Sequence, residues 1–353
     1  MSHPWALEPL SVGEFAPDFV AASRGNPQFH LNPIGGRYVL LAFMPVDRDR
    51  QAAAVAAFEA VRGLFDDRSL CAIFLAPAAD FQDVPPDRIP GQRWFLDPDG
   101  AIAGAFRPDE GWLLLDPALR VLDRAPLDRP APLFASLPHL PLASLDGDPS
   151  LVAPVLIVPR VFDADLCRTL VDRYDAEGGR LSGVMRDVDG RTVGVLDPMK
   201  QRRDVTIVEP ALKDRIRETL TRNLIPMIAR AFQFQATRLE RYLLACYDAD
   251  EGGYFRPHRD NRSFGTAHRR FAVSINLNAE DFDGGDLRFP EFGGRTYRPP
   301  TGGAVVFCCS LLHEATPVTR GRRYAFLPFL YDEAAEAIRN LNRSKVSASE
   351  PAP

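Results

Sequence analysis

Cysteine is scarce in this chain of 353 residues, which has five cysteines and no C-x-x-C pair. That number and spacing argue against a disulfide framework and against a zinc site, and they fit a reducing cytoplasm. No apolar run reaches about 18 residues, so no membrane-spanning helix is predicted. The first residues form neither a cationic segment nor an apolar one, so we expect no signal peptide.

An excess of positive charge is also lacking. The formal net charge is -5, and the arginines are scattered along the sequence rather than clustered. This pattern predicts no binding to nucleic acid and none to an anionic membrane. With 46% hydrophobic and 25% charged residues the chain can bury a sizeable core. Because domains usually have about 100 to 200 residues, its length suggests two of them.

Strand and helix signals alternate in the first part of the chain. Residues 38–44 and 70–76 are continuous apolar runs, as in buried strands, and residues 51–65 carry apolar side chains at helical spacing. Residues 112–115 and 120–122 flank an Asp-Pro turn and predict a β-hairpin. A βαβ unit followed by a hairpin predicts a thioredoxin-like α/β domain.

Two segments at the start of this domain, Val12–Phe19 and Gly36–Phe43, resemble the opening of peroxiredoxins of the AhpC/TSA type. That family carries its peroxidatic thiolate in a P-x-x-x-T-x-x-C loop, but here Asp49 and Ala52 stand at the Thr and Cys positions. Because peroxidase chemistry needs the thiolate, we expect a non-catalytic domain that serves in packing, in homodimer formation or in presenting substrate. Cys71 lies in an apolar run and is interpreted as a buried structural residue.

The domain organisation follows from composition. The predicted thioredoxin/peroxiredoxin-like domain covers residues 1–125, and the Pro-rich segment 126–150 is interpreted as a linker without regular structure. Residues 151–335 form the predicted second domain, and residues 336–353 a disordered tail.

The second domain opens with helices and continues with strands. Asp163 is a candidate N-cap for a helix that ends at Gly178, and residues 210–232 predict a longer helix that Pro226 kinks or breaks. These helices would cover one side of a sheet. Short predicted strands follow at 241–247, 270–278, 285–289, 296–298, 304–308 and 323–331. Many short strands separated by Gly and Pro predict a jelly roll, so the whole chain is predicted to be α+β with two domains.

An H-x-D pair, His258 and Asp260, and a third histidine, His313, lie among these strands. Side chains two apart on a strand point to the same face, so His258 and Asp260 can reach one ion. Two imidazoles and one carboxylate are the ligands of non-haem Fe(II) sites, and they leave part of the metal open. The alternative is that all three are surface residues on loops.

The sequence around these residues resembles the catalytic core of the prolyl 4-hydroxylase-like 2-oxoglutarate and Fe(II)-dependent dioxygenases. The resemblance rests on the order and spacing of four segments: Tyr247–Asn261, Gly284–Phe289, Pro300–Phe307 and His313–Tyr324. It implies a double-stranded β-helix with Fe(II) at its mouth, 2-oxoglutarate as co-substrate, O2 and ascorbate. The implied reaction hydroxylates a peptidyl-proline or a small molecule and releases succinate and CO2.

The resemblance also implies roles for individual residues. Arg323 would bind the far carboxylate of 2-oxoglutarate bidentately, while strand alternation predicts that Arg322 faces solvent, and Arg320 is interpreted as exposed too. Tyr247 would hydrogen-bond the co-substrate, or it is an ordinary strand aromatic. Asn276 would be another polar contact to the co-substrate.

Two other classes of function stay open at this point. The first is a thiol-based redoxin or peroxidase, which Ala52 argues against. The second is a non-catalytic sensor that binds 2-oxoglutarate or iron on an oxygenase scaffold, which the presence of all three ligands and Arg323 argues against.

Overall fold

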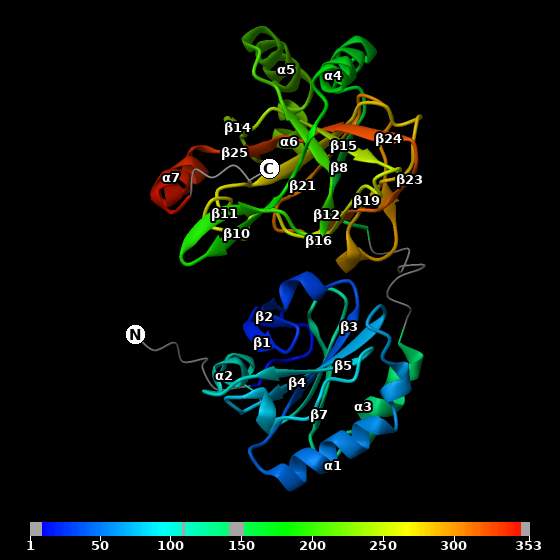
Figure 1. Cartoon of the computed structure of the whole chain (residues 1–353), viewed down its shortest axis with the longest axis vertical. Helices are drawn as coiled ribbons and strands as arrows, with labels where there is room; N and C mark the ends of the chain where they lie inside the picture. The colour runs from blue at the N-terminus through cyan, green and yellow to red at the C-terminus, as the bar shows by residue number, and fades with distance from the viewer. Residues whose placement is uncertain (1–8, 108–109, 141–151, 347–353) are drawn as a thin grey trace. The chain divides into compact units, whose positions relative to one another are not determined.

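The structure is a computed structural model that describes residues 9–107, 110–140 and 152–346. Its contacts divide the chain into two compact units, Met1–Val152 with Pro290–Arg295 and Ala153–Phe289 with Thr296–Pro353 (Figure 1). No helix in the described ranges is both long enough and apolar enough to cross a membrane.

The first unit is built on a seven-stranded sheet with the order β2-β1-β5-β4-β3-β6-β7. Its strands are β1 (Val20–Ser23), β2 (Asn26–His30), β3 (Tyr38–Phe43), β4 (Leu70–Ala76), β5 (Gln92–Leu96), β6 (Gly111–Leu115) and β7 (Val121–Pro126). Its helices are α1 (Arg48–Glu59), α2 (Ala101–Phe106) and α3 (Ala131–Ser136). Strands β3, β4 and β5 are parallel, and β6 and β7 form an antiparallel hairpin beside β3. This β3-α1-β4 unit followed by a hairpin is the predicted thioredoxin-like arrangement.

The apolar run of β3 is continuous because both faces of the sheet are covered. Leu40 and Ala42 belong to one core cluster, and Val39, Leu41 and Phe43 belong to another. The predicted strands and hairpin are confirmed. The helix predicted over residues 51–65 begins three residues earlier, because the Asp47 carboxylate accepts the first N–H groups of α1 as an N-cap. It also ends earlier, at Glu59, and a separate 3-10 turn covers Arg62–Leu64.

The prediction that residues 126–150 hold no regular element is wrong for part of that segment. Helix α3 and a 3-10 turn, Leu137–His139, follow β7, while residues 141–150 lie outside the described residues. Pro132 lies in the first turn of α3, where a backbone N–H would have no hydrogen-bond partner within the helix, so proline costs no helical hydrogen bond there. The helix persists because Phe134 packs edge-on against Trp112, with ring centroids 5.0 Å apart.

The second unit contains two main sheets. The larger has the order β14-β25-β17-β24-β15-β13-β9, and β21 pairs with both β17 and β8. These strands are β8 (Leu156–Val158), β9 (Arg180–Leu181), β13 (Arg203–Thr206), β14 (Arg238–Glu240), β15 (Leu243–Asp248), β17 (Phe271–Asn276), β21 (Ala304–Cys308), β24 (Arg322–Phe326) and β25 (Phe329–Tyr331). The single strand predicted over residues 323–331 is therefore two strands. Pro328 lies between them and has no backbone N–H to donate to a neighbouring strand.

The smaller sheet has the order β12-β16-β22-β19-β20, and two strand pairs, β10-β11 and β18-β23, complete the predicted jelly roll. The strands are β10 (Val184–Val188), β11 (Arg191–Val195), β12 (Lys200–Gln201), β16 (Tyr254–His258), β18 (Asp283–Gly284), β19 (Leu287–Arg288), β20 (Thr296–Tyr297), β22 (His313–Ala315) and β23 (Val318–Arg320). Antiparallel strands from distant parts of the sequence therefore meet at the mouth of this double-stranded β-helix.

Helices α4 (Ala164–Glu177), α5 (Pro210–Asn223) and α6 (Ile225–Phe232) cover one face of the larger sheet (Figure 1). The predicted cap is confirmed, since the Asp163 carboxylate accepts the N–H of Leu166. The predicted break near Pro226 is confirmed as well, because α5 ends at Asn223.

The prediction of a disordered tail from residue 336 is wrong up to residue 346. Helix α7 (Glu333–Asn342) crosses this boundary, and a 3-10 turn follows it. The Asp332 carboxylate caps the helix by accepting the Ala335 N–H at 2.9 Å, and the Ala335 side chain is fully buried. Arg339 donates to the Tyr331 hydroxyl at 2.7 Å. The Asp332 cap and the alanine- and glutamate-rich sequence of α7 are local helix signals that the prediction overlooked. Residues 347–353 lie outside the described residues.

Candidate metal centre and co-substrate cavity

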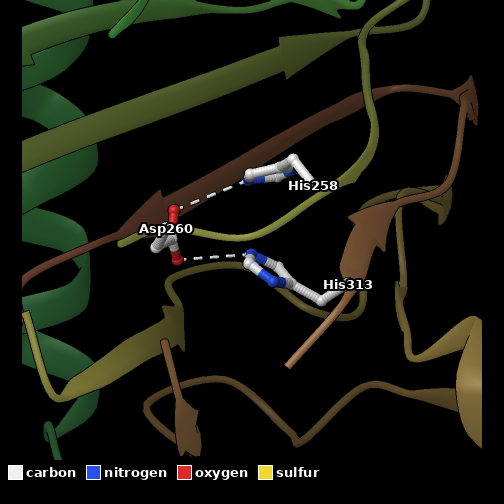
Figure 2. A group of neighbouring side chains, drawn as sticks. All are labelled: His258, Asp260 and His313. Atoms are coloured by element: carbon white, nitrogen blue, oxygen red, sulfur yellow. Dashed lines mark ion pairs between the residues drawn. The ribbon is translucent and has the colours of Figure 1, made fainter. Parts of the chain in front are cut away.

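The three predicted metal ligands meet at the end of the smaller sheet. Strands β16 and β22 are antiparallel, and His258 lies directly opposite His313. Asp260 follows β16 in a turn rather than on the strand itself, and its N–H donates to the Cys309 carbonyl at 3.0 Å. Its two carboxylate oxygens lie 3.6 Å from His258 Nε2 and 3.3 Å from His313 Nε2 (Figure 2). One potential ligand atom from each residue lies within 4.8 Å of the others.

Hydrogen bonds on the far side of each ring fix which nitrogen faces the centre. His258 Nδ1 lies 2.8 Å from the Arg256 carbonyl, and His313 Nδ1 lies 3.0 Å from the Leu311 carbonyl. A carbonyl only accepts, so Nδ1 carries the proton and Nε2 presents a lone pair. Burial lowers the pKa of His313 to about 4, which keeps it neutral. Burial alone would raise the pKa of Asp260, but both histidines lower it below its usual range. This donor set fits Fe(II).

A cavity of about 190 Å³ opens over the three residues and lies inside the second unit. Arg323 lines it and is 3% exposed. Its Nη2 donates to Ser274 Oγ at 2.8 Å, and its guanidinium carbon lies 5.2 Å from the centre of the Tyr247 ring. Burial lowers the pKa of Arg323, as expected for a cation without a carboxylate partner in direct contact.

The neighbouring arginines do not line the cavity, as strand alternation predicted for Arg322 and as was expected for Arg320. Arg322 is exposed and pairs with Asp248 at 2.7 Å, and Arg320 is exposed and pairs with Asp283 at 2.6 Å. Of these three arginines only Arg323 lines the cavity.

Tyr247 lines the cavity between two arginines. It pairs with Arg323 across β15 and β24, and its hydroxyl lies 3.3 Å from Arg202 Nη1. Arg202 is held by two bonds of 2.7 Å to the Asp204 carboxylate. Because Arg202 donates to the phenol oxygen, the phenol hydrogen stays available to a ligand.

Asn276 lies behind Arg323 rather than among the residues that line the cavity. Its Oδ1 accepts from Arg323 Nε at 3.4 Å, and its Nδ2 donates to the Pro299 carbonyl at 2.9 Å. The geometry makes Asn276 a positioning residue for Arg323, and a direct contact to the co-substrate stays a prediction.

Sequence reasoning missed several cationic residues of the cavity, namely Lys200, Arg202, Arg241 and Arg269. They belong to no motif, and they come from three separate places in the chain. Two-residue alternation along the strand of Tyr247 could have shown which side chains of that strand face the same way as Tyr247. It could not have shown which other strands pair with this strand in the sheet.

Residues 242–331 match the family model of the 2OG-Fe(II) oxygenase superfamily. A PKHD-type hydroxylase of Paraburkholderia phytofirmans (strain DSM 17436 / LMG 22146 / PsJN) is 31% identical over 187 residues, which cover 48% of this chain and 75% of that protein. A PKHD-type hydroxylase of Synechococcus sp. (strain JA-2-3B'a(2-13)) is 30% identical over 120 residues, 32% of this chain and 51% of that protein. The chain belongs to the 2OG-Fe(II) oxygenase superfamily.

This membership implies Fe(II) and 2-oxoglutarate as the ligands of the site. The match spans about half the length of the Synechococcus relative. Among solved structures, a Pseudomonas putida prolyl-4-hydroxylase is 21% identical with a TM-score of 0.38, over 52% of this chain and 94% of that one.

Proposed function

We propose that the chain is an Fe(II)- and 2-oxoglutarate-dependent dioxygenase. It would hydroxylate an unactivated C–H bond of a peptidyl-proline or a small molecule and release succinate and CO2. The observation that carries the proposal is the meeting of His258, Asp260 and His313 on a cavity that also holds the buried Arg323 guanidinium. The names of the PKHD-type hydroxylase relatives support the same reaction class.

Fe(II), when bound, supplies the activation of O2, which amino-acid side chains do not provide. His258 and His313 would hold the ion through Nε2, and Asp260 through a carboxylate oxygen. The carbonyls of Arg256 and Leu311 keep both rings oriented by accepting from Nδ1. Two neutral ligands and one anion leave a net positive centre that attracts an anionic 2-oxo acid.

Arg323 would bind the carboxylate of 2-oxoglutarate that lies away from the metal. Its Nη2 already donates a hydrogen bond to Ser274, and its Nε donates one to Asn276. Tyr247 can donate its hydroxyl hydrogen to the same carboxylate, because Arg202 donates to its oxygen. The co-substrate would then be held at both ends.

Apolar side chains exclude water around the ligands. The Phe307 ring centre lies 4.5 Å from that of His313, and Phe255 stacks on His258 at 3.4 Å. Leu287 and Ala315 also line the cavity. A low dielectric strengthens the expected pairing between Arg323 and a carboxylate.

The test is to load the full chain with Fe(II) and 2-oxoglutarate without O2, and to record the weak visible band of the metal–2-oxo acid complex. O2 and ascorbate are then added, succinate is measured, and a panel of prolyl peptides and small acids is searched by mass spectrometry for a gain of one oxygen atom. We expect slow succinate formation without substrate and faster formation with it. Absence of both the band and any 2-oxoglutarate consumption would refute the proposal.

A further inference from the structure

The cavity carries far more positive charge than the predicted ligands need. Eight basic side chains line it, and among the described residues Asp260 is the one carboxylate that does so. Three of the cations pair with carboxylates, Arg186 with Asp197, Arg202 with Asp204 and Arg269 with Glu240. In the proposed function one carboxylate of 2-oxoglutarate binds the metal and the other binds Arg323. Two more of the lining cations, Lys200 and Arg241, have no carboxylate among their hydrogen-bond or ion-pair partners in the described residues.

Arg241 is the clearest of these. It lines the cavity, its Nε is buried without a hydrogen-bond partner, and it forms no hydrogen bond or ion pair with any other described residue. Its guanidinium carbon instead lies 4.3 Å from the centre of the Phe329 ring. Burial, and then the charges of Arg269 and Arg202, lower its pKa to about 10, so it is still protonated at neutral pH. A desolvated cation of this kind attracts an anion.

The backbone at Arg241 supports a functional interpretation. Its φ is 53°, in the left-handed region that residues other than glycine rarely adopt. The residue lies between β14 and β15, and the predicted strand from residue 241 begins only at Leu243 for this reason. Unfavourable backbone conformations of this sort concentrate at ligand sites.

Lys200 is a second buried basic residue that lines the cavity and makes no hydrogen bond to a carboxylate. Its Nζ donates to Ser182 Oγ at 2.6 Å and to the Gly183 carbonyl at 2.8 Å, and both partners are neutral. Burial lowers its pKa well below the usual range, and the charges of Arg202 and Arg241 lower it further, while Asp204 and Asp260 oppose the shift. The repulsion that Arg241 exerts on Lys200 would be relieved by an anion bound near both.

We propose that Arg241, supported by Lys200, forms a subsite for an oxyanion of the substrate, such as a carboxylate or a sulfate-like group. The subsite is separate from Arg323, whose contacts are Tyr247, Ser274 and Asn276. This inference rests on the proposed function and narrows it, because the substrate is then an acid, either a small organic acid or an acidic prolyl peptide. Uncharged and cationic substrates are disfavoured by the unpaired cations.

The probe is sodium sulfate, titrated calorimetrically at constant ionic strength into the full chain loaded with Fe(II) and 2-oxoglutarate without O2. We expect binding at one site, at least tenfold weaker in Arg241→Met and intermediate in Arg241→Lys. Lys200→Gln should weaken it as well, and provides a second variant should Arg241→Met fail to fold. The matched control is Arg230→Met, at an exposed arginine on α6 outside the cavity, which should bind sulfate like the unaltered chain.

The visible band of the iron–2-oxoglutarate complex should persist in Arg241→Met, which shows that the variant is folded and that the subsite is distinct. No sulfate binding by the unaltered chain, or equal binding by Arg241→Met, would overturn the inference. Loss of 2-oxoglutarate rather than sulfate would also overturn it, because Arg241 would then bind the co-substrate. If the unaltered chain shows neither the band nor 2-oxoglutarate consumption, the proposed function fails, but sulfate titration of the chain alone still tests the subsite.

The source of the oxyanion is tested by competition against bound sulfate. N-acetylproline represents a small acid, and a prolyl peptide with blocked ends and one aspartate represents an acidic peptide. Displacement by one acid but not by its amide counterpart supports the subsite and identifies its class of substrate. Equal displacement by the amides would contradict a charge-selective site.

Discussion

Replacing Arg323 by leucine tests the co-substrate site most directly. The guanidinium is 3% exposed, lines the cavity and has only neutral partners, Ser274 and Asn276. If it pairs with a carboxylate of 2-oxoglutarate, its loss leaves a buried anion unpaired at a cost of roughly 3 to 5 kcal/mol. At about 1.4 kcal/mol per tenfold, binding should weaken about 100- to 1,000-fold. Arg323→Lys should recover part of the loss, because the charge remains while the bidentate geometry does not.

The assay is the apparent affinity for 2-oxoglutarate at saturating Fe(II), followed by the visible band under anaerobic conditions. Arg320→Leu and Arg322→Leu are the matched controls, since both arginines are exposed and pair with surface carboxylates. Each should change the affinity by less than about threefold. A larger loss in Arg322→Leu than in Arg323→Leu would refute the assignment.

Three further predictions concern other parts of the molecule. His258→Ala and His313→Ala should each abolish succinate formation and weaken iron binding while circular dichroism stays unchanged, so normal iron titrations in both would disprove the ligand assignment. The chain should not consume peroxide through Cys71, because that thiol is buried and burial raises its pKa to about 12; turnover lost in Cys71→Ser would contradict this. Burial alone would raise the pKa of Glu240, but the larger opposite effect of Arg269 and His268 holds it below its usual range. The ionised carboxylate therefore stabilises the folded state above about pH 4.3, its pKa in the unfolded chain, and this stabilisation is lost as the pH falls below that value. Acid unfolding should therefore be shallower in Glu240→Gln, and an identical pH dependence would count against the pairing.

The sequence predicted the elements whose signals are local. The strand 70–76 has the same bounds in the structure, and the Asp163 cap lies where it was expected. Helix α3 was missed because it depends on a distant contact, the packing of Phe134 against Trp112. Helix α7 was missed although its signals are local, since Asp332 caps it and its sequence is rich in alanine and glutamate, which favour helix.

The sequence by itself determined the types of the candidate ligands. His258 and Asp260 are two residues apart, so local geometry alone keeps their side chains near one another, and the order of motifs around His313 carried the resemblance to the family. Strand alternation also separated Arg323 from Arg322, because period-two geometry is a property of the chain alone.

Only the tertiary structure decided which other charges face the cavity. Lys200, Arg202 and Arg241 become neighbours of the metal ligands through strand pairing between distant segments. Whether a cation has a partner depends on that pairing: Arg202 meets Asp204, whereas Arg241 meets the Phe329 ring and no carboxylate among the described residues. The charge balance of the cavity depends on contacts between residues far apart in the sequence, and no local sequence pattern shows these contacts. The structure was therefore needed to find that Arg241 has no carboxylate partner among the described residues.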